Sequence, residues 1–239
     1  MSNIEKYKRS ISAVILVLLL LPLYSCANRD GIIEPSVSPA QSETSTVPRD
    51  SSSSEPRQPT DNNGFSPENE ISGELTVTFD FIKQSGSASN QFAVWVEDAN
   101  GNYINTLYAT KFTAKGGYKN RPDSIPLWVE KSGITSMPDY YIDAVSGATP
   151  STGNQSYTWN LKDINGDPIA PGDYIVLVEG TLRWKNRVIY SGVIKIDSES
   201  ATIQTDAEYI YEASDKQPAL TGDSKENEMV GMVSVRFIP

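Results

Sequence analysis

The sequence predicts an all-β fold, an antiparallel, immunoglobulin-like β-sandwich of about nine strands over residues 71–239. Three observations predict it. Short segments alternate between apolar and polar residues, as strands with one buried face do. Turn signals such as Asn100-Gly101 and Asn165-Gly166 separate these segments. Almost no segment has the 3.6-residue period of an amphipathic helix. Many short strands between turns are typical of a sandwich.

The first three strands are predicted by this alternation. Residues 73–82 form the first strand, because every second residue is large and apolar: Leu75, Val77, Phe79 and Phe81. Residues 91–97 form the second, with Trp95 on the face opposite to that of its neighbours. Asp98-Ala99-Asn100-Gly101 is then a hairpin turn that leads into a third strand over residues 102–109.

The next segment, residues 113–136, is less regular because Gly116-Gly117 interrupts it. Within it, residues 125–130 fit either one helical turn or a short strand. Pro126 favours the helix, since proline suits the first helical position.

Regular strands return after residue 155. They are predicted over residues 156–161, 173–184, 187–196, 207–212 and 230–238, with an acidic loop over 214–228. The strand over 173–184 is apolar on both faces, which is expected for a central strand of a sandwich.

Composition limits the chemistry that the chain can perform. It contains no histidine and one cysteine, so histidine-based catalysis and His-ligated zinc are excluded. A hydrolase would have to use carboxylates, or serine with lysine. The net charge is −10, and the sequence has no stripe of Lys and Arg, so nucleic acid is not an expected partner.

The N-terminus reads as an export signal. Lys6, Lys8 and Arg9 precede an apolar run over residues 11–23, which is too short to span a membrane. Cys26 follows the small residue Ser25. This end resembles the lipobox of bacterial lipoproteins, which implies a signal peptide over residues 1–25 and a lipid on Cys26.

Residues 26–70 are rich in Ser, Pro and Thr and lack apolar periodicity. Such a segment cannot bury enough apolar surface to fold, so we expect a disordered tether. The chain is then expected to lie outside the cytoplasm, held to the membrane by its lipid.

One stretch of the sequence is a candidate functional site rather than only a structural element. It is Asp143-Ala144-Val145-Ser146-Gly147-Ala148-Thr149-Pro150. Gly147 and Pro150 predict a tight turn, and Ser146 and Thr149 place two hydroxyls on it.

Two weaker candidate sites use carboxylates. Asp163, Asn165 and Asp167 alternate as in a calcium loop, but the glycine comes too early and the later glutamate is absent, so a hairpin turn explains them better. No metal site is therefore expected. Glu97, Asp98 and Glu130 supply enough carboxylates for a glycan-active protein, although nothing in the sequence fixes their separation.

Several segments, taken in order, resemble the bacterial periplasmic family called domain of unknown function 2271. They are residues 92–98, Leu127-Trp128, residues 143–150, Trp159, Pro171-Gly172-Asp173-Tyr174 and Val178-Glu179. The likeness covers about residues 73–196. The part from Trp159 to Tyr174 is also similar to the immunoglobulin-like module of flagellar-hook capping proteins. The family has no established activity, and its members are thought to sit among extracytoplasmic electron-transfer components, including flavin transferases.

The stretch Asp143-x-x-Ser146-Gly147-Ala148-Thr149 is also similar to the acceptor motif of FMN-binding domains, in which a transferase esterifies the threonine hydroxyl with FMN phosphate. Matched by position, Thr149 is the attachment point. Asp143, Ser146, Gly147 and Ala148 would be recognised by the transferase or shape the loop. Known acceptors are α/β domains, whereas this chain reads as all-β, so a purely structural turn and another ligand loop remain open.

The tryptophans Trp95, Trp128 and Trp159 could stack on a flavin ring, or could belong to the core and rim of the sandwich.

Taken together, these resemblances imply a lipid-anchored, non-catalytic accessory or binding component linked to extracytoplasmic flavin electron transfer. Its partners would then be the flavin transferase or a redox membrane protein. The alternative is a structural or adhesion module of the envelope that binds a protein or cell-wall partner without a cofactor.

Overall fold

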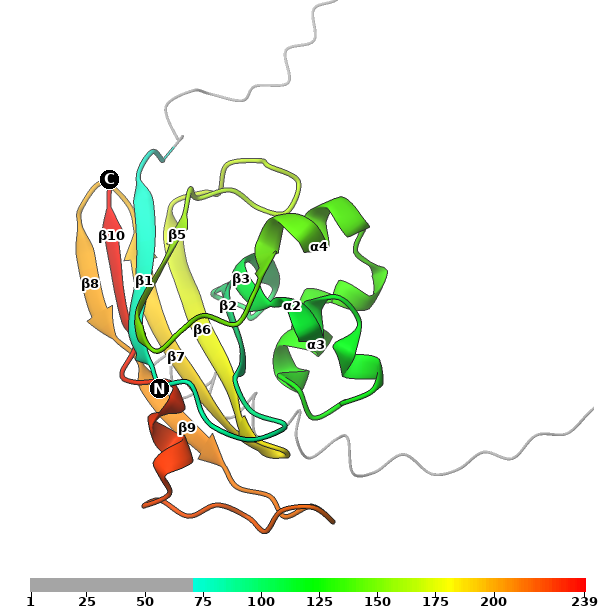
Figure 1. Ribbon diagram of the computed structural model, residues 1–239. Coiled ribbons are helices and arrows are strands. Elements are labelled where there is room, and N and C mark those ends of the chain that lie inside the picture. Colours follow the sequence, from blue (N-terminus) through cyan, green and yellow to red (C-terminus); the bar gives the residue numbers. More distant parts are fainter. Residues whose placement is uncertain (1–70) are drawn as a thin grey trace, which may run out of the picture. The chain divides into compact units, whose positions relative to one another are not determined.

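A computed structural model describes residues 71–239 of the chain (Figure 1). The predicted signal peptide, Cys26 and the predicted tether lie outside the described residues. The described part contains two β-sheets, which confirms the predicted sandwich. It has ten strands, β1 to β10, over Glu74–Phe81, Gln91–Asp98, Tyr103–Thr110, Ser146–Gly147, Gly153–Trp159, Gly172–Arg183, Asn186–Ile196, Ala201–Gln204, Asp206–Ile210 and Ser234–Ile238.

The smaller sheet has the strand order β5-β1-β10-β8, and the larger has the order β4-β3-β2-β6-β7-β9. β1 is a central strand, paired antiparallel with β5 on one side and with β10 on the other. Its apolar alternation is borne out, since Leu75, Val77, Phe79 and Phe81 all point into the core between the sheets. The alternating residues of β2 and β6 face them and complete this inner core.

Both Asp-x-Asn-Gly segments fold into the same turn. Asp98 N–H donates to the carbonyl of Asn102, and Asp98 Oδ1 accepts from Asn100 N–H and Asn102 N–H. Asp163 repeats these bonds with Asn165 and Asp167. The turns end in Gly101 and Gly166, whose φ angles of 83° and 88° glycine adopts without strain. The interpretation of Asp163–Asp167 as a turn is confirmed.

The expectation of almost no helix was wrong. Between β3 and β4 the chain forms three short helices, α2 (Lys111–Ala114), α3 (Pro126–Ser132) and α4 (Asp139–Val145), with 3₁₀ turns η2 (Gly117–Lys119) and η3 (Ile134–Ser136). Figure 1 shows them as a layer beside the larger sheet. Residues 126–130 are thus helical, and Pro126 begins α3 as predicted.

The helical layer covers the outer face of the larger sheet and forms a second core with it. Trp95 of β2, Leu177 of β6, Trp128 of α3 and Tyr141 of α4 belong to this outer core. Because the larger sheet is buried on both faces, β2 is buried along almost its whole length. β6 is apolar on both faces because one face packs in the core between the sheets and the other packs against the helical layer. A helical layer was not part of the prediction from the sequence.

Helix α3 is held to the sheet by buried polar side chains. Glu179 of β6 accepts hydrogen bonds from the backbone N–H groups of Trp128, at 2.8 Å, and Leu127, at 3.3 Å. At the other end of the helix, Lys131 Nζ lies 3.2 Å from the buried carboxylate of Glu97. The first helical N–H groups lack partners within the helix, so a carboxylate there satisfies donors that burial would leave unbonded.

The last third of the chain moves from one sheet to the other. β8 pairs with β10 in the smaller sheet, and the following β9 pairs with β7 in the larger one. Gly192 of β7 permits this crossing, because a Cβ there would lie 2.8 Å from the side chain of Ile203. β8 and the two-residue β4 were not predicted from the sequence. The predicted first residues of β5, β9 and β10 lie one to four residues from the observed ones.

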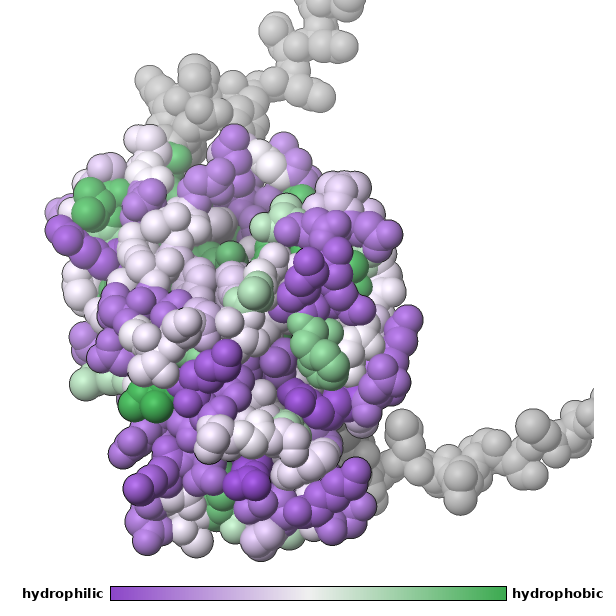
Figure 2. Space-filling view, in the orientation of Figure 1, coloured by the Kyte–Doolittle hydropathy of each residue, from purple (hydrophilic) through white to green (hydrophobic). Residues whose placement is uncertain are grey.

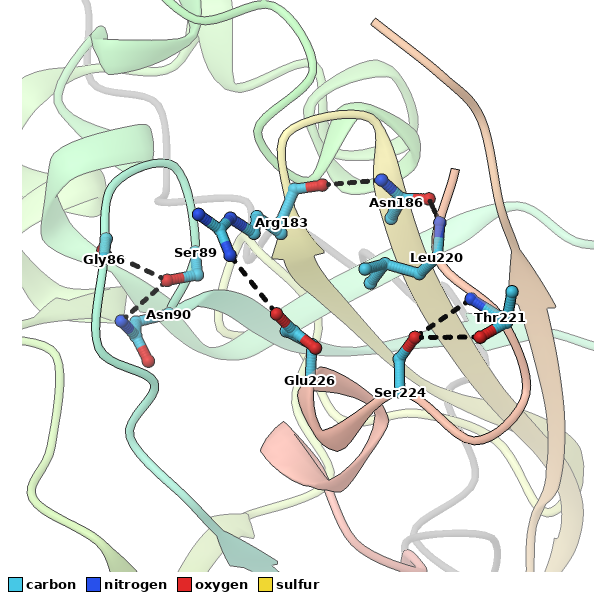
Figure 3. Close-up of polar contacts among 9 residues, drawn as sticks. All are labelled: Gly86, Ser89, Asn90, Arg183, Asn186, Leu220, Thr221, Ser224 and Glu226. Carbon is cyan, nitrogen blue, oxygen red and sulfur yellow. Dashed lines mark hydrogen bonds and ion pairs between the residues drawn. The ribbon is translucent and has the colours of Figure 1, made fainter. Parts of the chain in front are cut away.

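The predicted acidic loop contains a 3₁₀ helix, η4 (Lys225–Met229), and packs on the tip of the β6–β7 hairpin (Figure 3). Arg183 Nη1 lies 3.3 Å from Glu226 Oε1. Asn186 donates to the carbonyl of Arg183 and accepts from Leu220 N–H at 2.9 Å. These bonds fix the C-terminal segment before it enters β10.

The environment of Glu179 predicts a specific pH dependence. Burial raises its pKa to about 7, against 4.5 for an exposed glutamate, although Arg187 and the two N–H donors act in the opposite direction. Between these values the folded chain binds more protons than the unfolded one, so its stability falls as pH rises from about 4.5 through about 7. Glu179→Gln removes this dependence, and the loss of unfolding free energy across the window should shrink by about 3 kcal/mol.

Urea unfolding at several pH values measures this slope. Glu208→Gln, at an exposed position of β9, is the matched control and should keep the slope of the natural chain. An unchanged slope in Glu179→Gln would show that Glu179 is not the titrating group.

Candidate functional site

The stretch singled out from the sequence, residues 143–150, is not a tight turn. Asp143 lies in the last turn of α4, Ser146 and Gly147 form β4, and residues 148–150 continue without regular structure. β4 pairs parallel with β3, placing Ala109 opposite Ser146 and Thr110 opposite Gly147. The turn prediction failed because this edge contact between distant residues extends the chain, which the local signals of glycine and proline do not encode.

The first residues of the stretch have structural contacts. Asp143 is exposed and forms an ion pair with Lys115, whose hydrogen bond holds the pKa of that carboxyl below its usual value. The Ser146 hydroxyl is buried and has no hydrogen-bond partner among the described residues. An ion pair between exposed groups contributes little stability, so Asp143 is available to other partners.

Gly147 is required by a close approach of Tyr108. A Cβ at residue 147 would lie 2.7 Å from Tyr108 Cε2 and 3.2 Å from its hydroxyl oxygen. The Tyr108 hydroxyl also donates a hydrogen bond of 2.6 Å to the carbonyl of Ala148. The middle of the stretch is therefore fixed against the ring of Tyr108.

Thr149 differs from its neighbours. It is partly exposed, and its hydroxyl makes no hydrogen bond within residues 71–239. The segment is tied on both sides of it, by Tyr108 at Ala148 and by the N–H of Lys83, which donates to Thr152 Oγ1 at 2.9 Å. Thr149 thus presents an unbonded hydroxyl from a short segment whose ends are held.

An aromatic pair lies beside this segment. The rings of Tyr108 and Tyr157 are stacked, with centroids 4.5 Å apart and planes inclined by 27°, and both side chains are half-buried. Burial raises the pKa of both hydroxyls, so they stay protonated at neutral pH. The pair was not predictable from the sequence, because the contact joins β3 to β5 and leaves no local pattern.

The three tryptophans considered as flavin-stacking residues are core residues. Trp95 and Trp128 are fully buried and Trp159 nearly so. Each indole N–H is bonded internally, to Glu97, to Thr106 Oγ1 and to the carbonyl of Lys162 respectively. They have no free face for a ring to stack on, and the interpretation as core is confirmed.

The three candidate carboxylates for glycan chemistry do not converge. Glu97 is buried against Trp95 and Lys131, and Asp98 caps its turn, whereas Glu130 is exposed on α3. Across the described residues, no group of three acidic, cysteine or histidine side chains is arranged to hold a metal ion.

A cavity of about 350 Å³ lies in the helical layer, between α2 and η2 on one side and η3 and α4 on the other. Its lining includes Lys115, Tyr118, Lys119, Asp139 and Asp143. Asp143 is the one residue of the stretch 143–150 that also lines this cavity.

On the face seen in Figure 2 the surface is mostly hydrophilic, with apolar groups scattered singly.

The close packing of Gly147 makes a testable prediction. Gly147→Ala forces a methyl group into the ring of Tyr108, and such overpacking costs about 1–3 kcal/mol of unfolding free energy. The control Gly172→Ala places its methyl group where nothing lies within 4 Å, and should change stability little. Denaturant unfolding of both variants compares them. Equal stability would mean that Tyr108 moves aside without cost.

Comparison with known proteins bears on the whole domain. The family model DUF2271, described as a predicted periplasmic protein, matches residues 73–212. No curated protein and no solved structure matches the chain. None of the helices in the described part is both long and apolar enough to cross a membrane.

Proposed function

Because the chain belongs to the DUF2271 family of predicted periplasmic proteins, we propose that it is a non-catalytic, extracytoplasmic accessory component that carries FMN on Thr149. We also propose that a lipid on Cys26 holds it at the membrane. The observation that supports FMN attachment is the hydroxyl of Thr149, which is partly exposed and makes no hydrogen bond among the described residues.

The residues present fit an attachment point. A transferase must reach the hydroxyl, and the side chain before it is only the methyl group of Ala148, which is exposed. Thr149 Oγ would form the ester bond to the FMN phosphorus of a flavin dinucleotide donor. The P–O bond of the donor's pyrophosphate bridge breaks, the nucleoside monophosphate leaves with the bridging oxygen, and the hydroxyl proton is released. Bound FMN would supply one- and two-electron transfer.

The surrounding residues would position the acceptor. Tyr108 holds Ala148 on one side and the Lys83 N–H holds Thr152 on the other, so the hydroxyl is offered from a fixed place. Asp143 is exposed and its single ion pair, with Lys115, is one that a transferase side chain can replace. These contacts favour recognition of a folded segment rather than of a flexible loop.

The alternative is a structural or adhesion module without a cofactor. The observation in its favour is that Gly147 and Ala148 are explained by their contacts with Tyr108, and Asp143 by its ion pair with Lys115. On that interpretation the resemblance to an acceptor motif has a structural origin, and the ligands of the protein are other envelope components.

The mass of the intact protein distinguishes the two. The full chain, purified from its native host and denatured, should carry an added FMN mass that Thr149→Ala abolishes. Thr149→Ser keeps a hydroxyl and should retain at least part of the modification. The control Ser151→Ala removes a neighbouring, exposed hydroxyl that holds no part of the segment, and should leave the mass of the flavin in place. An unmodified natural chain, in a host whose flavin transferase is active, would exclude FMN attachment.

Membrane attachment is tested separately. Cys26→Ser removes the thiol to which lipid is attached, so the protein should move from the membrane fraction to the soluble extracytoplasmic fraction. Ser53→Ala, in the predicted tether, is the control and should stay with the membrane. A Cys26→Ser chain that remains membrane-bound after an alkaline wash would exclude the lipid as the anchor.

A further inference from the structure

We propose that the flavin ring attached to Thr149 docks on the aromatic pair formed by Tyr108 and Tyr157. This inference rests on the proposed function and adds to it a ring-binding surface. An isoalloxazine ring is flat and aromatic, with an apolar dimethylbenzene end and a polar pyrimidine end, and it gains from stacking on an aromatic side chain.

The proposed attachment point, Thr149, lies close to the tyrosine pair. The residue before Thr149 is already bonded to Tyr108, through the 2.6 Å hydrogen bond from its hydroxyl to the Ala148 carbonyl. A group attached at Thr149 therefore begins next to the tyrosine pair. The ribityl chain of FMN is flexible, so the ring can turn back onto a neighbouring surface without moving the backbone.

The tyrosine pair is also accessible from solvent, because both side chains are partly exposed. Tyr108 and Tyr157 are half-buried, whereas the tryptophans that the sequence suggested are enclosed in the two cores. Tyr157 lies on β5, an edge strand of the smaller sheet, and Tyr108 lies on β3 of the larger one. The pair thus joins the two sheets at this position, and both of its side chains are partly exposed.

Buried phenylalanines pack against the tyrosine pair from the core. Phe92 packs against both rings, at centroid distances of 5.2 Å from Tyr108 and 6.1 Å from Tyr157, and Phe79 packs against Tyr157 at 6.1 Å. Phe79 and Phe92 are buried core residues. A surface backed in this way is rigid, so little conformational entropy is lost when a ring binds to it.

The cavity of the helical layer is the competing location, and the charges there disfavour it. Lys115, Lys119, Asp139 and Asp143 form part of its lining, so the apolar dimethylbenzene end of the ring would have to displace water from charged groups there. The stretch contributes only Asp143 to this cavity, six residues before the attachment point. The tyrosine pair, by contrast, is bonded to the residue adjacent to Thr149.

Fluorescence anisotropy decay of the attached flavin tests the proposal on the full chain, because it separates fast motion of the ring from tumbling of the protein. In the natural chain we expect a small fast component. Tyr157→Leu removes the stacking face and should lower the ratio of docked to undocked ring about fivefold. Tyr157→Phe keeps the ring and should behave as the natural chain does. Tyr140→Leu changes a tyrosine that is 78% exposed on α4, and is the control.

The outcomes separate the two proposals. Absence of FMN from the intact mass contradicts the proposed function itself. A Tyr157→Leu chain that folds, carries FMN and shows an unchanged fast component overturns the docking proposal and favours the cavity. If Tyr157→Leu does not fold, the natural chain still decides: a ring as mobile as that of an FMN-modified threonine peptide would show that it does not dock.

Discussion

The architecture depends on the larger sheet being covered on both faces. Its inner face packs on the smaller sheet, as in any sandwich, but its outer face carries Glu97, Glu179 and Thr181 beside Trp95 and Leu177. Buried carboxylates are costly unless they are hydrogen-bonded or paired. The helical layer supplies those partners through the N–H groups at the start of α3 and through Lys131. The layer and the polar outer face therefore stabilise each other.

The strands were predictable and the helical layer was not, for the same physical reason. A strand such as β1 shows its burial as a period of two, and the alternation from Leu75 to Phe81 is visible in the sequence. The helices have four to seven residues, fewer than two full turns, and helices this short are stabilised mainly by packing. Pro126 gave the one local signal that the structure confirms in this layer.

The candidate site was predictable in its composition but not in its geometry. The sequence identified Thr149 and its neighbours, and the two Asp-x-Asn-Gly turns were predicted because all their bonds are local. The contact between Tyr108 and residues 147–148 joins positions about forty apart, and no periodicity records it. As a result the sequence pointed to tryptophans that are buried and gave no sign of the tyrosines that are partly exposed. The same contact accounts for Gly147 whether or not a cofactor is attached.

The place of β1 in the smaller sheet has a mechanical consequence. The described chain enters the domain through β1, which is bonded along both sides, to β5 and to β10. A pulling force on that end, directed along the strand, loads both ladders in shear, so many hydrogen bonds must yield together before the strand slips. Entry through an edge strand would let tension peel bonds apart one at a time. The two ladders of β1 therefore resist traction applied along the strand at its N-terminal end.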